Sequence, residues 1–158
     1  MSAVHEFSES NLVGEVVQDG IANLNFGSVD DHELNTTTYP ITRGNSSFEK
    51  YLRAKFSGTF TTISNMKFWR SDVLGYKTGE TLKAAANVAF ATPSTTPNAD
   101  SDIPLSEGTS LAIQSAAGTS TITAPGYTKY MRLQLQTTGS TPSGSVFQKV
   151  LTMQYDEV

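Results

Sequence analysis

The sequence contains no cysteine among its 158 residues. Disulfide bonds, thiolate zinc sites, iron–sulfur clusters and a cysteine nucleophile are therefore excluded, because each of them requires a thiol. The absence leaves the cellular compartment open, since a β-sandwich without disulfides can exist on either side of a membrane. A chain of this length is expected to fold as one domain, which buries about 70% of the surface of its unfolded form.

Charged residues are also scarce. They make up only 16% of the chain, against a typical share of about 25%, while Ser and Thr together supply about a quarter. Lys and Arg number 11 and Asp and Glu number 15, which gives a net charge of −4. Such a chain has no basic field that would attract phosphate backbones, so nucleic acid is not expected as a partner.

Long apolar runs are missing as well. The chain has no stretch of about 18 apolar residues, so we expect neither a membrane-spanning helix nor a membrane partner. Residues 1–14 include charged residues and no continuous apolar segment, which argues against a secretory signal. The polar residues 1–11 are expected to form an N-terminal arm ahead of a single domain at residues 12–158. Val4 and Phe7 are the apolar anchors by which this arm would bind a neighbouring subunit.

The dominant pattern that is present is a two-residue alternation of apolar and polar side chains. This pattern is typical of β-strands that bury one face and expose the other to water. Residues 48–56 and 59–69 alternate in this way and are predicted to pair as a hairpin. Residues 130–136 and 147–155 are predicted to form the central pair of a sheet.

Residues 81–91 contain several alanines, which favour a helix as well as a strand. The strand is preferred, because the apolar residues recur with a period of two and Pro93 follows the segment. Weaker strand candidates are residues 12–17, 21–26, 111–114 and 119–124. The longest connection, residues 92–108, is expected to be an excursion on the surface.

Many short strands separated by turn residues predict an all-β fold. We expect a single antiparallel β-sandwich that is jelly-roll-like, with an immunoglobulin-like sandwich as the alternative. The alternation assigns thirteen side chains to its core: Phe48, Leu52, Phe56, Phe60, Phe68, Leu82, Val88, Phe90, Leu133, Leu135, Phe147, Leu151 and Tyr155.

The sequence carries no motif that assigns catalysis. It lacks the G-x-S-x-G elbow and the phosphate-binding glycine motifs, so no catalytic residue and no cofactor is assigned and a non-enzymatic protein is expected. His32 stands in the acidic run of residues 30–33, but neighbouring side chains rarely converge on one metal ion, and a solvated turn is favoured. Asp100, Asp102 and Glu107 offer oxygen ligands without the spacing of a calcium loop, so no metal site is assigned.

Two aromatic residues, Trp69 and Tyr76, flank Arg70 and Asp72 where a predicted strand ends. A core position is favoured for Trp69, because tryptophan is mostly buried in folded proteins. A protein contact and a platform that stacks on a sugar are the alternatives. We therefore keep Trp69 and Tyr76 as candidate protein contacts.

Three parts of the sequence carry a likeness to a known family. The first joins NFGS at residues 25–28 to GNSSFEKY at 44–51, and the second joins FSGTF at 56–60 to ISNMKFW at 63–69. The third joins YMRLQL at residues 130–135 to PSG at 142–144 and LTMQYDE at 151–157. In these stretches, which cover most of residues 25–157, the chain resembles small virion structural proteins of tailed bacteriophages. The likeness lies in the general sequence pattern of these stretches and includes no catalytic motif.

This resemblance implies a decoration or cement protein that binds the head lattice and stabilises it. The implied partners are the major capsid protein and copies of the chain itself, with a trimer favoured. The implied location is the capsid exterior, after synthesis in the host cytoplasm. A tail, neck or fibre component and a carbohydrate-binding module that uses Trp69 and Tyr76 are the alternatives. A genome-packaging shell subunit is disfavoured, because the chain has no arm rich in Lys and Arg.

Overall fold

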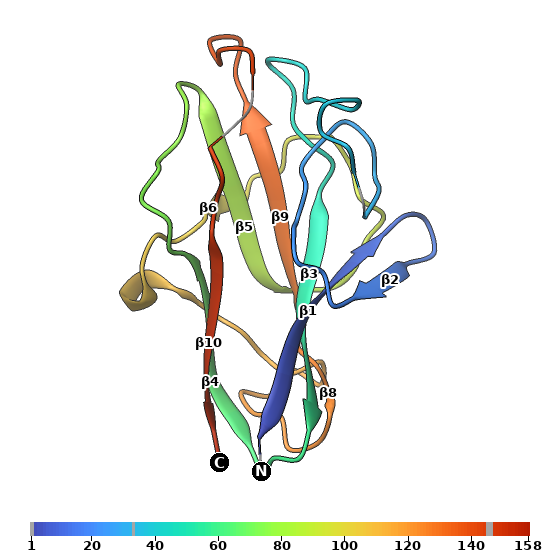
Figure 1. Cartoon of the computed structure of the whole chain (residues 1–158), viewed down its shortest axis with the longest axis vertical. Helices are drawn as coiled ribbons and strands as arrows, with labels where there is room; N and C mark the ends of the chain where they lie inside the picture. Colours follow the sequence, from blue (N-terminus) through green and yellow to red (C-terminus); the bar gives the residue numbers. More distant parts are fainter. Residues whose placement is uncertain (1, 33, 145–146) are drawn as a thin grey trace.

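Two antiparallel β-sheets pack against each other in the computed structural model (Figure 1). The structure describes residues 2–32, 34–144 and 147–158. Within these residues the only helical element is a short 3-10 helix, η1, at Glu107–Thr109. The prediction of an all-β antiparallel sandwich is therefore confirmed, and the alanine-rich segment 81–91 contains a strand, at Glu80–Val88, which ends three residues earlier than predicted.

The larger sheet has the strand order β2-β1-β3-β9-β5-β6, and β8 pairs with β3 outside this path. Its strands are β1 (Ala3–Asn11), β2 (Val16–Asp19), β3 (Lys50–Gly58), β5 (Glu80–Val88), β6 (Ser101–Asp102), β8 (Gly126–Tyr127) and β9 (Tyr130–Thr137). The smaller sheet has the order β10-β4-β7. Its strands are β4 (Ile63–Arg70), β7 (Leu111–Ala112) and β10 (Leu151–Glu157).

The order of the six longest strands corresponds to the immunoglobulin-like arrangement, the alternative predicted from the sequence. In an immunoglobulin domain, strands A, B, E and D form one sheet, and strands C, F and G form the other. Here β1, β3, β9 and β5 occupy positions A, B, E and D, and β4 and β10 occupy positions C and F. Among the described residues no strand pairs with the second edge of β10, where strand G would lie.

The core lies between the sheets and is supplied mainly by alternate residues of the six longest strands, β1, β3, β4, β5, β9 and β10. Six of the expected core residues are at most 2% exposed, namely Leu52, Phe56, Phe68, Leu82, Leu133 and Leu135. Six more are half-buried, namely Phe48, Phe60, Val88, Phe90, Leu151 and Tyr155. The assignment of Phe147 to the core is wrong: its side chain is 44% exposed, because the residue precedes β10 and belongs to no strand.

A bulge near the end of β5 moves two expected core residues, Val88 and Phe90, to the opposite face of the larger sheet. Asn87 has a φ of 60°, and the pairing of β5 with β9 shifts register at this residue. One extra residue inverts the alternation beyond it. Phe90 therefore packs with the rings of Tyr51 and Tyr130, at 5.0 and 5.9 Å, and not between the sheets. Val88 pairs with Tyr130 on this same face, so the prediction that Val88 and Phe90 share a face with Leu82 is wrong for both residues.

Both predicted strand pairings are wrong, although all four strands exist. Residues 48–56 and 59–69 correspond to β3 and β4, which lie in different sheets. Residues 130–136 and 147–155 correspond to β9, inside the larger sheet, and β10, at the edge of the smaller one. Alternation indicates which face of a strand is buried, but it does not indicate which other strand lies beside it in the sheet.

Residues 1–11, expected as an arm, contain β1, which pairs with β3 over residues 3–10 and with β2 over residues 8–11. Three of the weaker strand candidates are met only in part. Residues 12–17 divide into a turn and the start of β2, residues 111–114 contain β7, and residues 119–124 contribute the single bridge Ile63–Ile122. Residues 21–26 form no strand.

Loops cover the outer face of the larger sheet, which the alternation predicts to be exposed to water. Gln134 of β9 is fully buried, and its Nε2 lies 3.1, 3.3 and 3.0 Å from the carbonyl oxygens of Ser47, Ser94 and Thr96. Tyr51, on the same face, is only 1% exposed. The first part of residues 92–108 therefore packs against the sheet and is not a free excursion.

Candidate contact surfaces

The four residues predicted as protein contacts lie at separate places. Val4 of β1 is 57% exposed, whereas Phe7 of the same strand packs against the core, with its ring 6.3 Å from that of Phe68. Trp69 is half-buried and, because strand residues alternate, lies on the opposite face of β4 from Phe68. Tyr76, in the β4–β5 connection, packs against the core. The structure does not gather these four side chains into one site.

A different set of exposed side chains lies at the turn between β1 and β2, which projects from the side of the sandwich (Figure 1). Leu12, Val13, Val16 and Val17 are 42%, 82%, 48% and 40% exposed, and we call these four residues the hairpin tip. Their side chains are entirely aliphatic. Clusters of exposed apolar side chains are uncommon on monomeric proteins and typically mark interaction sites.

The hairpin tip is held in one conformation by hydrogen bonds to the sandwich. The backbone N–H of Leu12 donates to Asp30 Oδ2 at 2.7 Å, and the Tyr130 hydroxyl donates to the Glu15 carboxylate. Burial, together with this bond to Glu15, raises the pKa of Tyr130 to about 12. Leu12 and Glu15 both adopt positive φ values, of 65° and 59°, which these contacts maintain. A surface fixed in this way loses little conformational entropy when it binds.

A second group of exposed apolar side chains lies where the β4–β5 connection meets the segment before β10. Val73, Leu74, Phe147 and Val150 are 95%, 56%, 44% and 48% exposed, and we call these four residues the loop patch. One carboxylate joins the two segments: Asp72 Oδ1 accepts from the N–H of Leu74, and Asp72 Oδ2 accepts from the N–H of Val150, both at 3.1 Å. Residues distant in sequence thus form one surface.

Two lysines lie beside the aromatic ring of the loop patch. The ammonium groups of Lys77 and Lys149 lie 6.0 and 5.7 Å from the centre of the Phe147 ring. Beneath them, the Arg70 guanidinium lies 4.3 Å from the centre of the Tyr76 ring, and burial raises the pKa of the Tyr76 hydroxyl. Aromatic faces attract cations, so these contacts hold positive groups beside the exposed apolar side chains.

The acidic residues considered as calcium ligands do not converge on a common point. Each pairs with a different cation, at 2.7, 2.6 and 2.9 Å respectively: Asp100 with Arg132, Asp102 with Lys83 and Glu107 with Lys67. These cations lie on β9, β5 and β4, so the loop carboxylates connect the loop to both sheets. Within the described part of the chain, no three His, Asp or Glu side chains are placed to hold a metal ion.

The described part of the acidic run, residues 30–32, lies against the larger sheet through His32 and is not the solvated turn that the sequence predicts, although Asp31 is exposed; Glu33 lies outside the described residues. The His32 side chain is only 11% exposed, and its Nδ1 lies 4.0 Å from Glu9 Oε2. Lys50 Nζ lies 2.7 Å from Glu9 Oε1 and donates to the carbonyl oxygen of Asp31 at 2.7 Å. Both Lys50 and Glu9 are fully buried, and no sequence signal indicated this ion pair.

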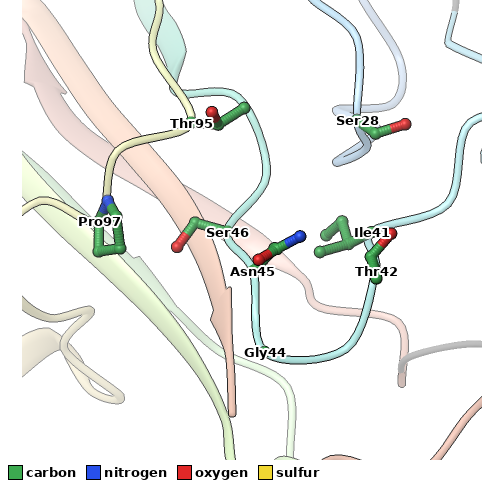
Figure 2. A pocket seen from close by; sticks show the side chains of 8 residues that line it. All are labelled: Ser28, Ile41, Thr42, Gly44, Asn45, Ser46, Thr95 and Pro97. Atoms are coloured by element: carbon green, nitrogen blue, oxygen red, sulfur yellow. The ribbon is translucent and has the colours of Figure 1, made fainter. Parts of the chain in front are cut away.

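A cavity of about 280 Å³ lies between the β2–β3 and β5–β6 connections. Figure 2 shows the side chains that line it. Its lining residues are Ser28, Ile41, Thr42, Gly44, Asn45, Ser46, Thr95 and Pro97. They supply hydroxyl and amide groups and no acid, base or charged side chain. This lining can hydrogen-bond to water or to a neutral polar group, but it contains no residue for acid–base or nucleophilic chemistry.

No protein-family model, curated protein sequence or solved structure matches this chain. Within the residues that the structure describes, no helix has the length and apolar character needed to cross a bilayer. The exposed surfaces described above are the aliphatic hairpin tip and the loop patch with its lysines, and one edge of β10 is paired by no strand of the described residues.

Proposed function

We propose that this protein is a non-enzymatic structural component of a virion, a decoration or cement protein that binds the head lattice and stabilises it. The sequence resemblance described above supports the virion assignment. The hairpin tip supports the binding role, because it presents four exposed aliphatic side chains, two on a turn that hydrogen bonds hold in place and two at the start of β2. Burial of such side chains against a partner is favourable by about 25 cal/mol for each Å² removed from water.

The proposed action is mechanical. A decoration protein that contacts the major capsid protein and copies of itself joins neighbouring subunits, so the shell opens only when those contacts also break. The strands of the larger sheet are hydrogen-bonded to one another in sequence from β2 to β6. These cross-strand hydrogen bonds keep the strands together when the molecule is pulled, which suits a protein that reinforces a shell. No covalent bond is made or broken in this function.

Electron microscopy of particles from the virus that encodes this chain tests the proposal. We expect a density on the outside of the head that fits the sandwich, repeated hundreds of times per particle. A few dozen copies in multiples of three, six or twelve would instead assign the chain to the tail or neck. Particles without the protein contradict the proposal, as do decorated and undecorated heads that release their genome at the same temperature.

A further inference from the structure

The hairpin tip and the loop patch lie on opposite sides of the sandwich. In Figure 1 the β1–β2 turn projects at the right, and the β4–β5 connection runs along the left. Both surfaces are apolar, but they differ in chemistry, because the tip is aliphatic and the patch contains the ring of Phe147. Two different apolar surfaces on opposite sides of one molecule can bind each other only between copies.

The charges near the two surfaces have opposite signs. The hairpin and the segments bonded to it carry six carboxylates and three cations, a net charge of −3: Glu6, Glu9, Glu15, Asp19, Asp30 and Asp31 with Lys50, Arg53 and Lys55. The loop patch and the side chains beneath it carry three cations and two carboxylates, a net charge of +1: Arg70, Lys77 and Lys149 with Asp72 and Glu80. Complementary potentials favour correct encounters and disfavour tip-to-tip and patch-to-patch contacts.

We propose that the hairpin tip of one copy of this chain binds the loop patch of the next copy, so that the copies associate head to tail. The inference rests on the proposed function, in which the protein contacts copies of itself, and it names the two surfaces that make this contact. Val13, the most exposed residue of the tip, packs against Val73 and Phe147 in this arrangement. Lys77 then faces the acidic side of the hairpin, where Glu15 lies.

A head-to-tail contact between unlike surfaces is heterologous. Such contacts form a closed ring when the rotation between copies closes, and an open chain when it does not. Because the two surfaces lie on opposite sides of the molecule, this contact favours an open chain or a ring of many copies over the trimer that the sequence resemblance implies. A dimer with a twofold axis requires instead that one surface bind its own copy.

Two substitutions at highly exposed positions test this geometry in the purified protein. Val13→Lys adds a positive charge to the tip, and Val73→Glu adds a negative charge to the patch; the parent side chains are 82% and 95% exposed, so folding is not disturbed. Each variant places a like charge against its partner surface. In sedimentation velocity, wild type should form oligomers that weaken as salt is added, and each variant alone should associate more than about tenfold more weakly.

The mixture of the two variants is the decisive sample. Val13→Lys keeps an intact patch and Val73→Glu keeps an intact tip, so an equimolar mixture should recover association that neither variant shows alone. If only one of the two substitutions weakens association, the contact is a twofold contact and the proposal is wrong. A wild type that stays monomeric up to its solubility limit also overturns it.

Leu105→Lys provides the matched control. Leu105 is 58% exposed and belongs to neither surface, so this variant should associate as wild type does. Far-ultraviolet circular dichroism of each variant confirms that the strands are intact. These samples contain only this chain, so a wild type that does not associate would contradict the tip-to-patch contact without bearing on the virion assignment. Conversely, virus particles that lack the protein would contradict the virion assignment without bearing on self-association.

Discussion

Two charged side chains, Lys50 and Glu9, are fully buried under the segment that contains His32. Lysine and glutamate are almost never buried unless they are paired. Alternation of apolar and polar residues predicts that charged side chains are exposed, so it does not predict the burial of Lys50 and Glu9. Glu9 also falls within residues 1–11, which the sequence predicts to be a polar arm. Their burial follows from contacts between residues 41 positions apart, which no local pattern reports.

Replacing one member of this pair should be far more harmful than replacing both. Lys50→Met leaves the Glu9 carboxylate buried without its cation, which should lower the free energy of unfolding by about 3–5 kcal/mol. The double variant Glu9→Met/Lys50→Met removes both charges and should cost about 1–2 kcal/mol, mainly from the lost hydrogen bond to the Asp31 carbonyl. Urea unfolding of the three proteins measures the difference. Equal losses in the single and double variants would contradict the expected coupling.

His5 should make the folded state sensitive to acid. Its ring lies 4.9 Å from the Phe7 ring and 5.4 Å from the Phe56 ring, and burial lowers the pKa of His5 from its ordinary 6.5, with Glu6 opposing the shift only in part. The unfolded chain therefore takes up a proton at a higher pH than the folded chain. The stability linked to His5 is present above pH 6.5 and is lost as the pH falls through the lowered pKa.

Urea unfolding at pH 7.5 and at pH 5.5 measures this effect. His5→Phe keeps an aromatic ring in the same place and removes the titrating group. The variant should therefore lose less stability than wild type between the two pH values. If both proteins lose the same amount, the acid sensitivity originates elsewhere.

At the scale of the element, local alternation located the strands whose two faces differ most. β3, β4, β5, β9 and β10 are all found close to their predicted positions. The alternation did not predict β1 as a strand. Its inward side chains are Ala3, His5 and Phe7, which do not form the aliphatic series that marks a buried strand face. Residues 21–26 alternate without forming a strand, because Ile21, Leu24 and Phe26 pack against the core from a loop.

Leu133 tests the face assignment of β9. The side chain is fully buried between the sheets, so Leu133→Ala should lower the free energy of unfolding by about 2–5 kcal/mol through lost burial and the cavity that remains. Val73→Ala, at a side chain that is 95% exposed, should change stability by less than about 0.5 kcal/mol. Thermal unfolding of both variants gives the comparison. A melting temperature unchanged by Leu133→Ala would mean that this face of β9 is not in the core.

At the scale of the whole molecule, the candidate surfaces depend on which sheet edge and which loops remain uncovered. The sequence pattern treated residues 12–17 as a strand, and only the projection of the β1–β2 turn exposes Leu12 and Val13. The loop patch depends on contact between the β4–β5 connection and the segment before β10, through Asp72. Both features arise from tertiary placement, which strand periodicity does not encode.

The open edge of β10 offers a second way for copies to associate, and hydrogen exchange distinguishes it from the proposed contact. The N–H of Ser71 donates to the carbonyl oxygen of Val150 at 2.9 Å, so the backbone groups of Thr152 face β4 and those of Leu151 and Met153 face away. Amide exchange followed by NMR should therefore be slow at Thr152 and fast at Leu151 and Met153. The comparison is between wild type at an associating concentration and the Val13→Lys variant. Tip-to-patch contact leaves exchange at Leu151 and Met153 fast in both samples, whereas edge-to-edge pairing of β10 strands would slow it in wild type alone.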